Sequence, residues 1–350
     1  MCSMTSVILS NTMLASKFRG CMIGALMGDC LGAPFEGDRS VSNRVLTNYF
    51  NNLTSGGSIQ IFPYTDDTAM TLSVAKSLVE NGTLDPRDMA KRFVTEFYSQ
   101  PKRGYGMNVV NVFRALKETH FEDVFLPAKS QFDGSGSYGN GAAMRIAPIA
   151  LFGTKKGEDF IRKAAEECSR LTHTHPDGYN GAILQCLAVN TALGLDPTKN
   201  LDPVHFICSL ENKMENIEMK GDKKTYSESL KKIKDIYLKK QEDISAEEIA
   251  EYLGNAVSAQ RSVPTAIYSF LRGLSPFPEY ESSNPFVRTL FFAISIGGDT
   301  DTIASMAGSI AGAYHGADSI PEKMQKRCEL IDEVIELADK LFDKTEKDDS

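Results

Sequence analysis

Apolar residues recur at spacings of three and four along almost the whole chain, the spacing of a helix with one buried face. Alternation of apolar and polar residues, which is typical of a half-buried strand, does not extend beyond a few residues. The pattern therefore predicts an all-α protein. The first helix is predicted from Leu14 to Leu31, and a second long helix is predicted to begin near Gly178.

Small residues repeat every four positions in the first predicted helix and again near the C-terminus. Glycine inside a helix costs about 1 kcal/mol relative to alanine, so such a ladder needs a packing reason. We expect these two helices to approach closely and to cross at the centre of the fold. The repeated positions are Gly20, Gly24, Gly28, Gly32, Ala304, Gly308 and Gly312.

Turn residues mark helix ends but no domain boundary. Asp85-Pro86 predicts the cap and first turn of a helix, and Asn81-Gly82 predicts the end of the helix before it. The charged stretch 213–248 is predicted to be an excursion over the surface. Because no linker or repeat is present, we predict one domain over residues 1–350, with an ordered core of about 14–342 and a tail that frays from Lys344.

The composition narrows the classes of function. A formal charge of -8 and a pI near 5.3 argue against a broad basic surface for nucleic acid. No apolar run approaches the roughly 20 residues that cross a bilayer, and the segment 3–14 is too polar for a secretory signal, so we expect no membrane partner. The seven cysteines form no C-x-x-C pair, which favours reduced intracellular thiols and argues against zinc.

Two short acidic clusters are the most informative feature. Thr65 to Thr68 reads Thr-Asp-Asp-Thr, Gly297 to Thr302 reads Gly-Gly-Asp-Thr-Asp-Thr, and each predicts the start of a helix. Each cluster alone is explained by helix capping, because acids in a first turn interact favourably with the helix dipole. Together they favour a shared cage of carboxylate and hydroxyl oxygens, which is the ligand set of Mg²⁺. The two glycines before Asp299 would let the backbone come close to the bound ion. This hypothesis requires Asp67 and Asp301 to be neighbours.

Two single residues each allow two interpretations. Glu36 lies in a loop bounded by glycine and proline, and is either an exposed loop acid or a movable carboxylate that reaches the metals or activates water. His173 either satisfies a helix end or donates a hydrogen bond to a ribose or phosphate.

The glycine-rich segment from Asp133 to Gly141 also allows two interpretations. It is either a plain surface loop or a nest of backbone N–H groups for phosphate oxygens. We predict that a helix follows at once, over Ala142 to Arg145, and adds positive potential. Tyr138 within the loop, flanked by Phe132, offers a ring that could stack on a base.

Taken together, these segments resemble the signature blocks of the ADP-ribosylglycohydrolases. The blocks follow in order from about Phe18 to about Gly316, and the joint occurrence of the two acidic clusters is the specific part. Two further segments look most like the vertebrate branch that removes ADP-ribose from serine. The matching blocks are Pro34 to Glu36, Thr65 to Thr68, Gly136 to Gly141 with Met144 and Arg145, and Gly298 to Thr302; the branch-specific segments are Gly178 to Ile183 and Ser262 to Ile267.

The resemblance implies a compact orthogonal multi-helix bundle with two Mg²⁺ ions at its centre. Glu36, Asp67 and Asp301 would act in catalysis. Tyr138 would stack on adenine, with Val257 against it. The implied metal ligands are Glu36, Thr65, Asp66, Asp67, Asp299, Asp301 and Thr302, and the implied substrate-binding residues are Asp67, Phe132, Ser135, Gly136, Ser137, Tyr138, Gly139, Asn140, Gly141, His173 and Val257. Asn108 and the turn His175 to Asp177 depart from the family pattern.

The implied activity is Mg²⁺-dependent cleavage of the O-glycosidic bond between ADP-ribose and serine, and also of poly(ADP-ribose) and related ADP-ribosyl esters. The alternatives are an arginine-directed hydrolase and a non-catalytic ADP-ribose-binding or crystallin-like protein. The implied partners are serine-modified proteins made during DNA damage, poly(ADP-ribose) and the product ADP-ribose, with a monomer as the default. Nucleus and cytoplasm are the expected compartments. The mitochondrial matrix is an option because Lys17 and Arg19 precede the first acid, Asp29.

Overall fold

The computed structural model describes residues 9–55, 60–219, 224–239 and 244–347. Over these ranges the chain forms 17 α-helices, four short 3₁₀ helices and three isolated bridges, and no strand. The prediction of an all-α fold is confirmed. None of the described helices combines the length and the apolar character needed to span a bilayer.

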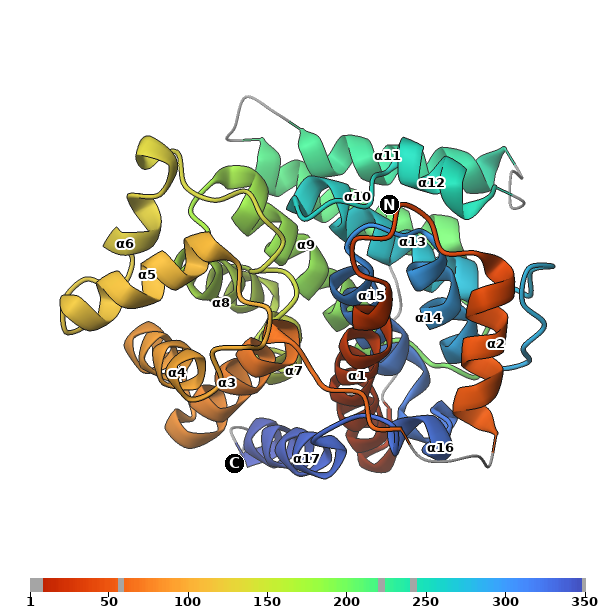
Figure 1. Cartoon of the computed structure of the whole chain (residues 1–350), viewed down its shortest axis with the longest axis horizontal. Coiled ribbons are helices and arrows are strands. Elements are labelled where there is room, and N and C mark those ends of the chain that lie inside the picture. The colour runs from red at the N-terminus through yellow and green to blue at the C-terminus, as the bar shows by residue number, and fades with distance from the viewer. Residues whose placement is uncertain (1–8, 56–59, 220–223, 240–243, 348–350) are drawn as a thin grey trace.

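The elements follow one another along the chain with short connections (Figure 1). The 3₁₀ helices are η1 (Ala33–Phe35), η2 (Phe132–Gly134), η3 (Ala259–Arg261) and η4 (Ala317–Ser319). The α-helices are α1 (Asn11–Gly32), α2 (Asn43–Thr54), α3 (Asp66–Asn81), α4 (Pro86–Ser99), α5 (Met107–Glu118), α6 (Leu126–Lys129), α7 (Ala147–Phe152), α8 (Glu158–Arg170), α9 (Pro176–Leu193), α10 (Pro203–Glu218), α11 (Thr225–Leu238), α12 (Ala246–Tyr252), α13 (Val263–Gly273), α14 (Pro285–Ser295), α15 (Thr300–His315), α16 (Glu322–Gln325) and α17 (Ile331–Lys347).

The two helices with repeated small residues, α1 and α15, pack together in the middle of the molecule (Figure 1). A Cβ atom on Gly24 would overlap the carbonyl oxygen of Gly308, so only glycine allows this approach. The close approach is confirmed, but the prediction of a crossing is wrong, because the pairing continues along both helices in antiparallel order. The paired positions are Gly20 with Gly312, Gly24 with Gly308, Gly28 with Ala304, and Gly32 with Thr300.

The antiparallel pairing places the end of α1 beside the start of α15. The loop after α1 is joined to the residues before α15 by two backbone hydrogen bonds, from Gly37 N–H to the oxygen of Gly298 at 2.8 Å and from Gly298 N–H to the oxygen of Asp38 at 2.7 Å. Glu36 and Asp299 therefore meet although more than 250 residues separate them in the sequence.

The predicted helix ends at α3 and α4 are confirmed. Asp85 caps α4 by accepting hydrogen bonds from the N–H groups of Arg87 and Asp88. Gly82 ends α3 with a φ of 67°, a conformation that favours glycine.

Both ends of the described chain are more helical than predicted. Helix α1 begins at Asn11, because the Ser10 side chain caps it by accepting from Met13 N–H. Helix α17 continues to Lys347, so the prediction of a tail that frays from Lys344 is wrong for residues 344–347. Glu346 near this end forms an ion pair with Lys155 at 2.9 Å. Residues 348–350 lie outside the described residues.

The charged stretch 213–248 also packs more closely than predicted. Helix α11 buries an apolar face that includes Leu230 and Ile233. The buried Glu218 carboxylate accepts hydrogen bonds from the backbone N–H groups of Tyr226 and Ser227, at 2.8 and 2.9 Å. On α11 the charged residues Glu228, Lys231 and Lys232 are exposed, so the composition of the segment did not reveal its buried apolar face.

Candidate active site

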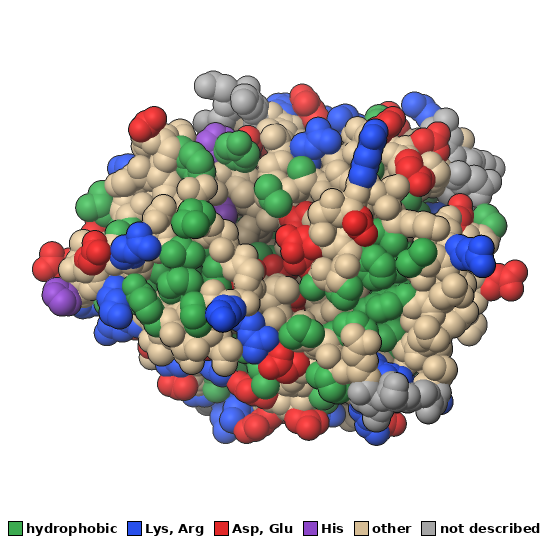
Figure 2. Space-filling model, viewed as in Figure 1, with side chains coloured by type: hydrophobic (Ala, Val, Ile, Leu, Met, Phe, Trp, Pro, Cys, Tyr) green, Lys and Arg blue, Asp and Glu red, His purple; other side chains and the backbone are tan. Residues whose placement is uncertain are grey.

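The two acidic clusters line one cavity of about 300 Å³. Figure 2 shows acidic side chains gathered around a hollow near the middle of one face. All seven residues predicted as metal ligands lie on the cavity wall, namely Glu36, Thr65, Asp66, Asp67, Asp299, Asp301 and Thr302.

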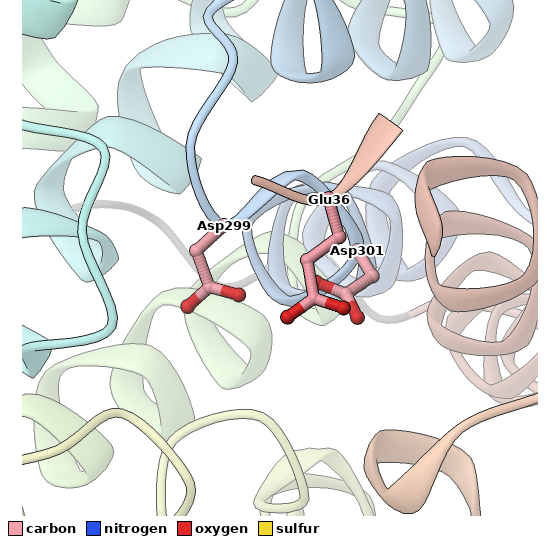
Figure 3. Close-up of side chains that lie close together, drawn as sticks. All are labelled: Glu36, Asp299 and Asp301. Atoms are coloured by element: carbon pink, nitrogen blue, oxygen red, sulfur yellow. The ribbon is translucent and has the colours of Figure 1, made fainter. Parts of the chain in front are cut away.

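Side chains from opposite ends of the sequence are in contact here. The Thr302 hydroxyl donates a hydrogen bond to Asp67 Oδ1 at 3.3 Å. Glu36, Asp299 and Asp301 each place a carboxylate oxygen within 4.8 Å of the other two, and their carboxyl groups point the same way (Figure 3). The requirement that Asp67 and Asp301 be neighbours is met.

A buried carboxylate that sequence reasoning missed, Asp29, holds the start of α3. It accepts hydrogen bonds from the N–H groups of Thr65 and Thr68, at 3.0 and 3.1 Å, and from both of their hydroxyls, at 2.8 and 2.5 Å. The signal was an aspartate in the last turn of an apolar, glycine-laddered helix, where a buried acid needs hydrogen-bond partners. Asp29 thereby joins α1 to the first acidic cluster.

Burial is the main cause of raised pKa values in this group. It raises the pKa of Asp67 well above the usual range, with the charge of Asp301 as the next cause. Burial followed by the charge of Asp299 raises the pKa of Asp301 to about 9. Burial followed by the charge of Asp29 raises the pKa of Asp66 to about 7. Without a cation, burial and mutual repulsion therefore favour the protonated forms of these acids.

The geometry fits a divalent cation. Asp67 Oδ2 is buried and has no hydrogen-bond partner among the described residues, which would be costly if nothing else bound to it. The surrounding donors are carboxylate and hydroxyl oxygens, the ligands that hard cations prefer. A cation would displace the retained protons and satisfy the orphaned oxygen together.

The glycines before Asp299 have a role different from the one predicted. Both have a φ of 74°, in the left-handed region. A Cβ atom on Gly298 would overlap the backbone oxygen of Asn255, and one on Gly297 would lie 2.6 Å from the backbone oxygen of Arg39. They therefore let the chain pack against two neighbouring backbone segments, a role that the sequence did not predict.

The glycine-rich loop also lines the cavity and is hydrogen-bonded to one of the acids. Asn140 N–H donates to the oxygen of Val257 at 2.9 Å, so Val257 lies beside this loop. The Asn140 side-chain amide donates to Asp299 Oδ2 at 2.5 Å and to Ser262 Oγ at 3.1 Å. One side chain thus connects the loop to an acid of the second cluster.

The predicted helix over Ala142 to Arg145 is absent, and these residues form turns before α7 begins at Ala147. Pro148 has no N–H, so a continuous helix would lose a backbone bond here. The Arg145 guanidinium also donates to the oxygen of Gly141 at 2.7 Å, which closes the turn. The positive potential expected from a helix start therefore does not come from this segment.

The structure places the eleven predicted substrate-binding residues in two groups. Asp67, Ser137, Gly139, Asn140, Gly141, His173 and Val257 line the cavity. Phe132, Ser135, Gly136 and Tyr138 are not among the lining residues. Gly136 packs against Thr174, and the Ser135 hydroxyl donates to the backbone oxygen of Phe132.

Two aromatic rings stand exposed next to the loop. Phe132 and Tyr138 are 48% and 51% exposed, and their rings stack with centroids 6.5 Å apart. Two adjacent exposed rings offer a flat apolar surface on which a planar base could stack.

His173 lies on the wall of the cavity rather than only satisfying a helix end. Its backbone N–H donates to Ser169 at 2.8 Å, and Nδ1 is 2.7 Å from the Thr172 hydroxyl. Burial, followed by the charge of Arg145, lowers the pKa of His173 to about 3. The imidazole is therefore neutral at physiological pH.

The segment around Asn108, which departs from the family pattern, also lines the cavity, although none of its residues was predicted to bind metal or substrate; the lining residues are Gly104, Gly106, Met107, Asn108 and Val109. Met107 is 74% exposed at the rim, beside Asn108. The preceding residue Arg103 accepts a hydrogen bond from Asp66 N–H through its backbone oxygen and pairs with Glu329 through its side chain, at 2.7 and 2.8 Å. The available signal in the sequence was Gly104 itself, a residue typical of tight turns, which adopts a φ of 91°.

Comparison with known proteins gives a consistent result over nearly the full chain. A family model described as ADP-ribosylglycohydrolase matches residues 10–350. ADP-ribosylhydrolase ARH3 of Mus musculus is 43% identical over 345 residues, which cover 93% of this chain and 91% of the relative. The Homo sapiens protein of the same name is 43% identical over 344 residues, with 93% of each chain covered.

A solved structure titled ADP-ribosylglycohydrolase-related protein complex has a similar fold, with a TM-score of 0.67 and 20% identity. The likeness covers 95% of this chain and 99% of the other.

Proposed function

The chain is an ADP-ribosyl hydrolase of the ADP-ribosylglycohydrolase family, and from that premise we propose that it uses Mg²⁺ to release ADP-ribose from serine side chains of proteins. Poly(ADP-ribose) and related ADP-ribosyl esters are proposed as further substrates. The observation that carries the proposal is the polarity of a single cavity. Five carboxylates line it together with a glycine-rich loop, a neutral histidine and a buried arginine.

This polarity matches the two ends of ADP-ribose. The acidic side suits a ribose diol held through cations, and the loop side suits a diphosphate held by N–H groups. The exposed rings of Phe132 and Tyr138 lie beside the loop, and we propose that Tyr138 stacks on adenine with Val257 against it. Phe132, Ser135 and Gly136 would then support the loop rather than touch the diphosphate.

We propose two Mg²⁺ ions, held by the seven oxygen-bearing residues that line the acidic side. When bound, they would orient the ribose hydroxyls and stabilise charge on the departing oxygen. Asp67 and Asp301 contribute the buried carboxylates that fix this end of the ligand. Thr302 orients Asp67 through its hydroxyl.

Glu36 is the residue we propose to act on water. It lies at the mouth of the cavity, and burial followed by the charge of Asp299 raises its pKa, which strengthens it as a base. In the proposed step, water attacks the anomeric carbon of ADP-ribose and the bond from that carbon to the serine oxygen breaks. Glu36 accepts a proton from the water and passes it to the departing serine oxygen, which leaves as a hydroxyl, so that Glu36 ends the step as it began.

The linkage preference rests on the segments Gly178 to Ile183 and Ser262 to Ile267, which resemble the serine-directed branch. The partners that follow are serine-modified proteins, poly(ADP-ribose) and free ADP-ribose. Nucleus and cytoplasm, with the mitochondrial matrix as an option, are the proposed compartments, and a monomer is the proposed state.

A release assay tests the proposal. Peptides carrying ADP-ribose on serine or on arginine, and poly(ADP-ribose), are incubated with the protein in Mg²⁺ or in excess chelator. We expect Mg²⁺-dependent release from serine and from the polymer, and little from arginine. Preferential release from arginine would support the arginine-directed alternative. No release from any substrate, with a thermal stability indifferent to Mg²⁺ and ADP-ribose, would support the non-catalytic alternative.

A further inference from the structure

The cavity is also lined by a buried cation that forms no ion pair with any described residue. Arg145 is fully buried, and its guanidinium donates to the backbone oxygens of Gly141 and Cys168, at 2.7 and 2.9 Å. It lies over the ring of Phe93, with 4.8 Å from the guanidinium carbon to the ring centroid. Its Nε is buried with no hydrogen-bond partner among the described residues, none of which supplies a carboxylate within ion-pair distance. Its positive charge is therefore available to an anionic ligand in the cavity that Arg145 lines.

Arg145 reaches His173 through Thr172. One guanidinium nitrogen donates to Thr172 Oγ1 at 2.8 Å, and the same oxygen is 2.7 Å from His173 Nδ1. A guanidinium can only donate, so the threonine oxygen is the acceptor in the first bond. Among the described residues, the remaining partner for the threonine proton is Nδ1. Nδ1 is then an acceptor, and the ring proton of the neutral imidazole is on Nε2.

The His173 imidazole is not protonated on both nitrogens at neutral pH. Burial and the nearby charge of Arg145 lower the pKa of His173 to about 3.

The Nε2 edge of the ring faces a space that two glycines keep open. A Cβ atom on Gly139 would lie 3.2 Å from Nε2, and one on Gly141 would lie 3.0 Å from the adjacent Cε1. Nε2 itself has no hydrogen-bond partner among the described residues, and His173 lines the cavity. The result is a single uncharged N–H donor at the cavity wall, beside the glycine-rich loop.

We propose that Arg145 and Thr172 are positioning residues that hold His173 as its neutral Nε2–H tautomer, so that this N–H binds a phosphate oxygen of a nucleoside diphosphate. The buried charge of Arg145 stabilises the same anion from behind. The opposite tautomer would present a lone pair to the phosphate and would repel it. The inference deepens the proposed function and rests on it for the identity of the ligand.

The tautomer is measured on the free full-length protein labelled with ¹⁵N-histidine, by long-range ¹H–¹⁵N correlation at pH 7. The chain has five histidines, so His173→Gln assigns the signal. We expect a protonated Nε2 and an unprotonated Nδ1. In Thr172→Val we expect this pattern to change to a mixture of tautomers, and in Thr172→Ser we expect it to return. A protonated Nδ1 in the unmodified protein, alone or together with Nε2, overturns the proposal.

Binding of ADP and of adenosine, measured by calorimetry, separates positioning from general damage. Loss of one hydrogen bond to a charged group predicts ADP binding about tenfold weaker in Thr172→Val. Adenosine, which lacks phosphate, should be unaffected, and Thr172→Ser should restore ADP binding. The matched control is Thr154→Val, whose hydroxyl donates to backbone oxygens at the end of α7, and it should bind ADP as the unmodified protein does.

Equal loss of ADP and adenosine binding, or unchanged ADP binding in Thr172→Val, overturns the proposal. If Thr172→Val does not fold, the tautomer in the unmodified protein still decides. Neither measurement requires hydrolysis. A protein that shows the predicted tautomer and phosphate dependence but releases no ADP-ribose would therefore refute the proposed function and leave this inference standing.

Discussion

At the scale of single residues, the start of α3 depends on Asp29, which is fully buried. Its carboxylate accepts hydrogen bonds from four donor groups, the backbone N–H and the hydroxyl of both Thr65 and Thr68. Asp29→Asn keeps the size of the side chain but turns an NH₂ group toward these donors. We expect a loss of about 2–3 kcal/mol in the free energy of unfolding, measured in urea. Mg²⁺ binding measured by calorimetry should weaken as well.

The matched control is Asp332→Asn, an exposed acid in the first turn of α17, which should leave both measurements unchanged. An Asp29→Asn protein with the stability and Mg²⁺ affinity of the unmodified protein would refute the role assigned to Asp29.

Protonation of Asp66 and Asp301 predicts how stability depends on pH. Their pKa values are about 7 and about 9 in the metal-free folded protein, against 3.8 when unperturbed. Between these values the folded state binds more protons than the unfolded state, so stability decreases as pH rises. The melting temperature of the metal-free protein should fall from pH 5 to pH 9, and the increase caused by Mg²⁺ should grow over the same range. A Mg²⁺ effect that is independent of pH would contradict this.

At the scale of elements, the α1–α15 contact depends on the absence of side chains. A Cβ atom on Gly308 would overlap the carbonyl oxygen of Gly24. In an exposed helix, alanine would be favoured over glycine by about 1 kcal/mol, but here we expect Gly308→Ala to destabilise the fold by about 3 kcal/mol or more in urea unfolding. Gly194→Ala is the control, because the nearest atom to its added Cβ is 3.7 Å away. An equal free energy of unfolding for Gly308→Ala and Gly194→Ala would contradict this, because it would show that α1 and α15 can move apart without loss of stability.

Helix ends that depend on residues within one turn could be predicted from the sequence, as at Asp85 and Gly82. The turn at Ala142 to Arg145 could not, because it is closed by a guanidinium whose burial depends on distant segments. The antiparallel course of α1 and α15 was also missed. A ladder of glycines indicates close approach but carries no information on direction.

At the scale of the whole molecule, the two acidic clusters could be predicted as one site because each is a short run of neighbouring acids and threonines at a helix start. Asp29, Thr172 and Arg145 could not be assigned to the site in the same way. Each acts through a partner that the fold alone brings close, and neither a single buried acid nor a single threonine has a distinctive spacing. The position of Tyr138 outside the cavity wall likewise depends on how the loop folds.

The two halves of the cavity are joined by Asn140, whose amide donates to Asp299 at 2.5 Å. A cation on Asp299 and a diphosphate on the loop would both hold Asn140 in this orientation, so each should strengthen binding of the other. We expect Mg²⁺ to increase ADP-ribose affinity by about 5- to 10-fold in calorimetry, and Asn140→Ala to abolish most of this increase. ADP-ribose affinity that is indifferent to Mg²⁺ in the unmodified protein would show that the halves act independently.

The central claim is that two acidic helix starts, remote in sequence, act as one catalytic centre. The most direct test compares the initial rate of ADP-ribose release from a serine-linked peptide by the unmodified protein, by Asp67→Asn and by Asp301→Asn, with folding verified by urea unfolding. The account predicts that each folded variant is slower by about 100-fold or more. A folded variant of either residue that releases ADP-ribose at the unmodified rate would contradict it.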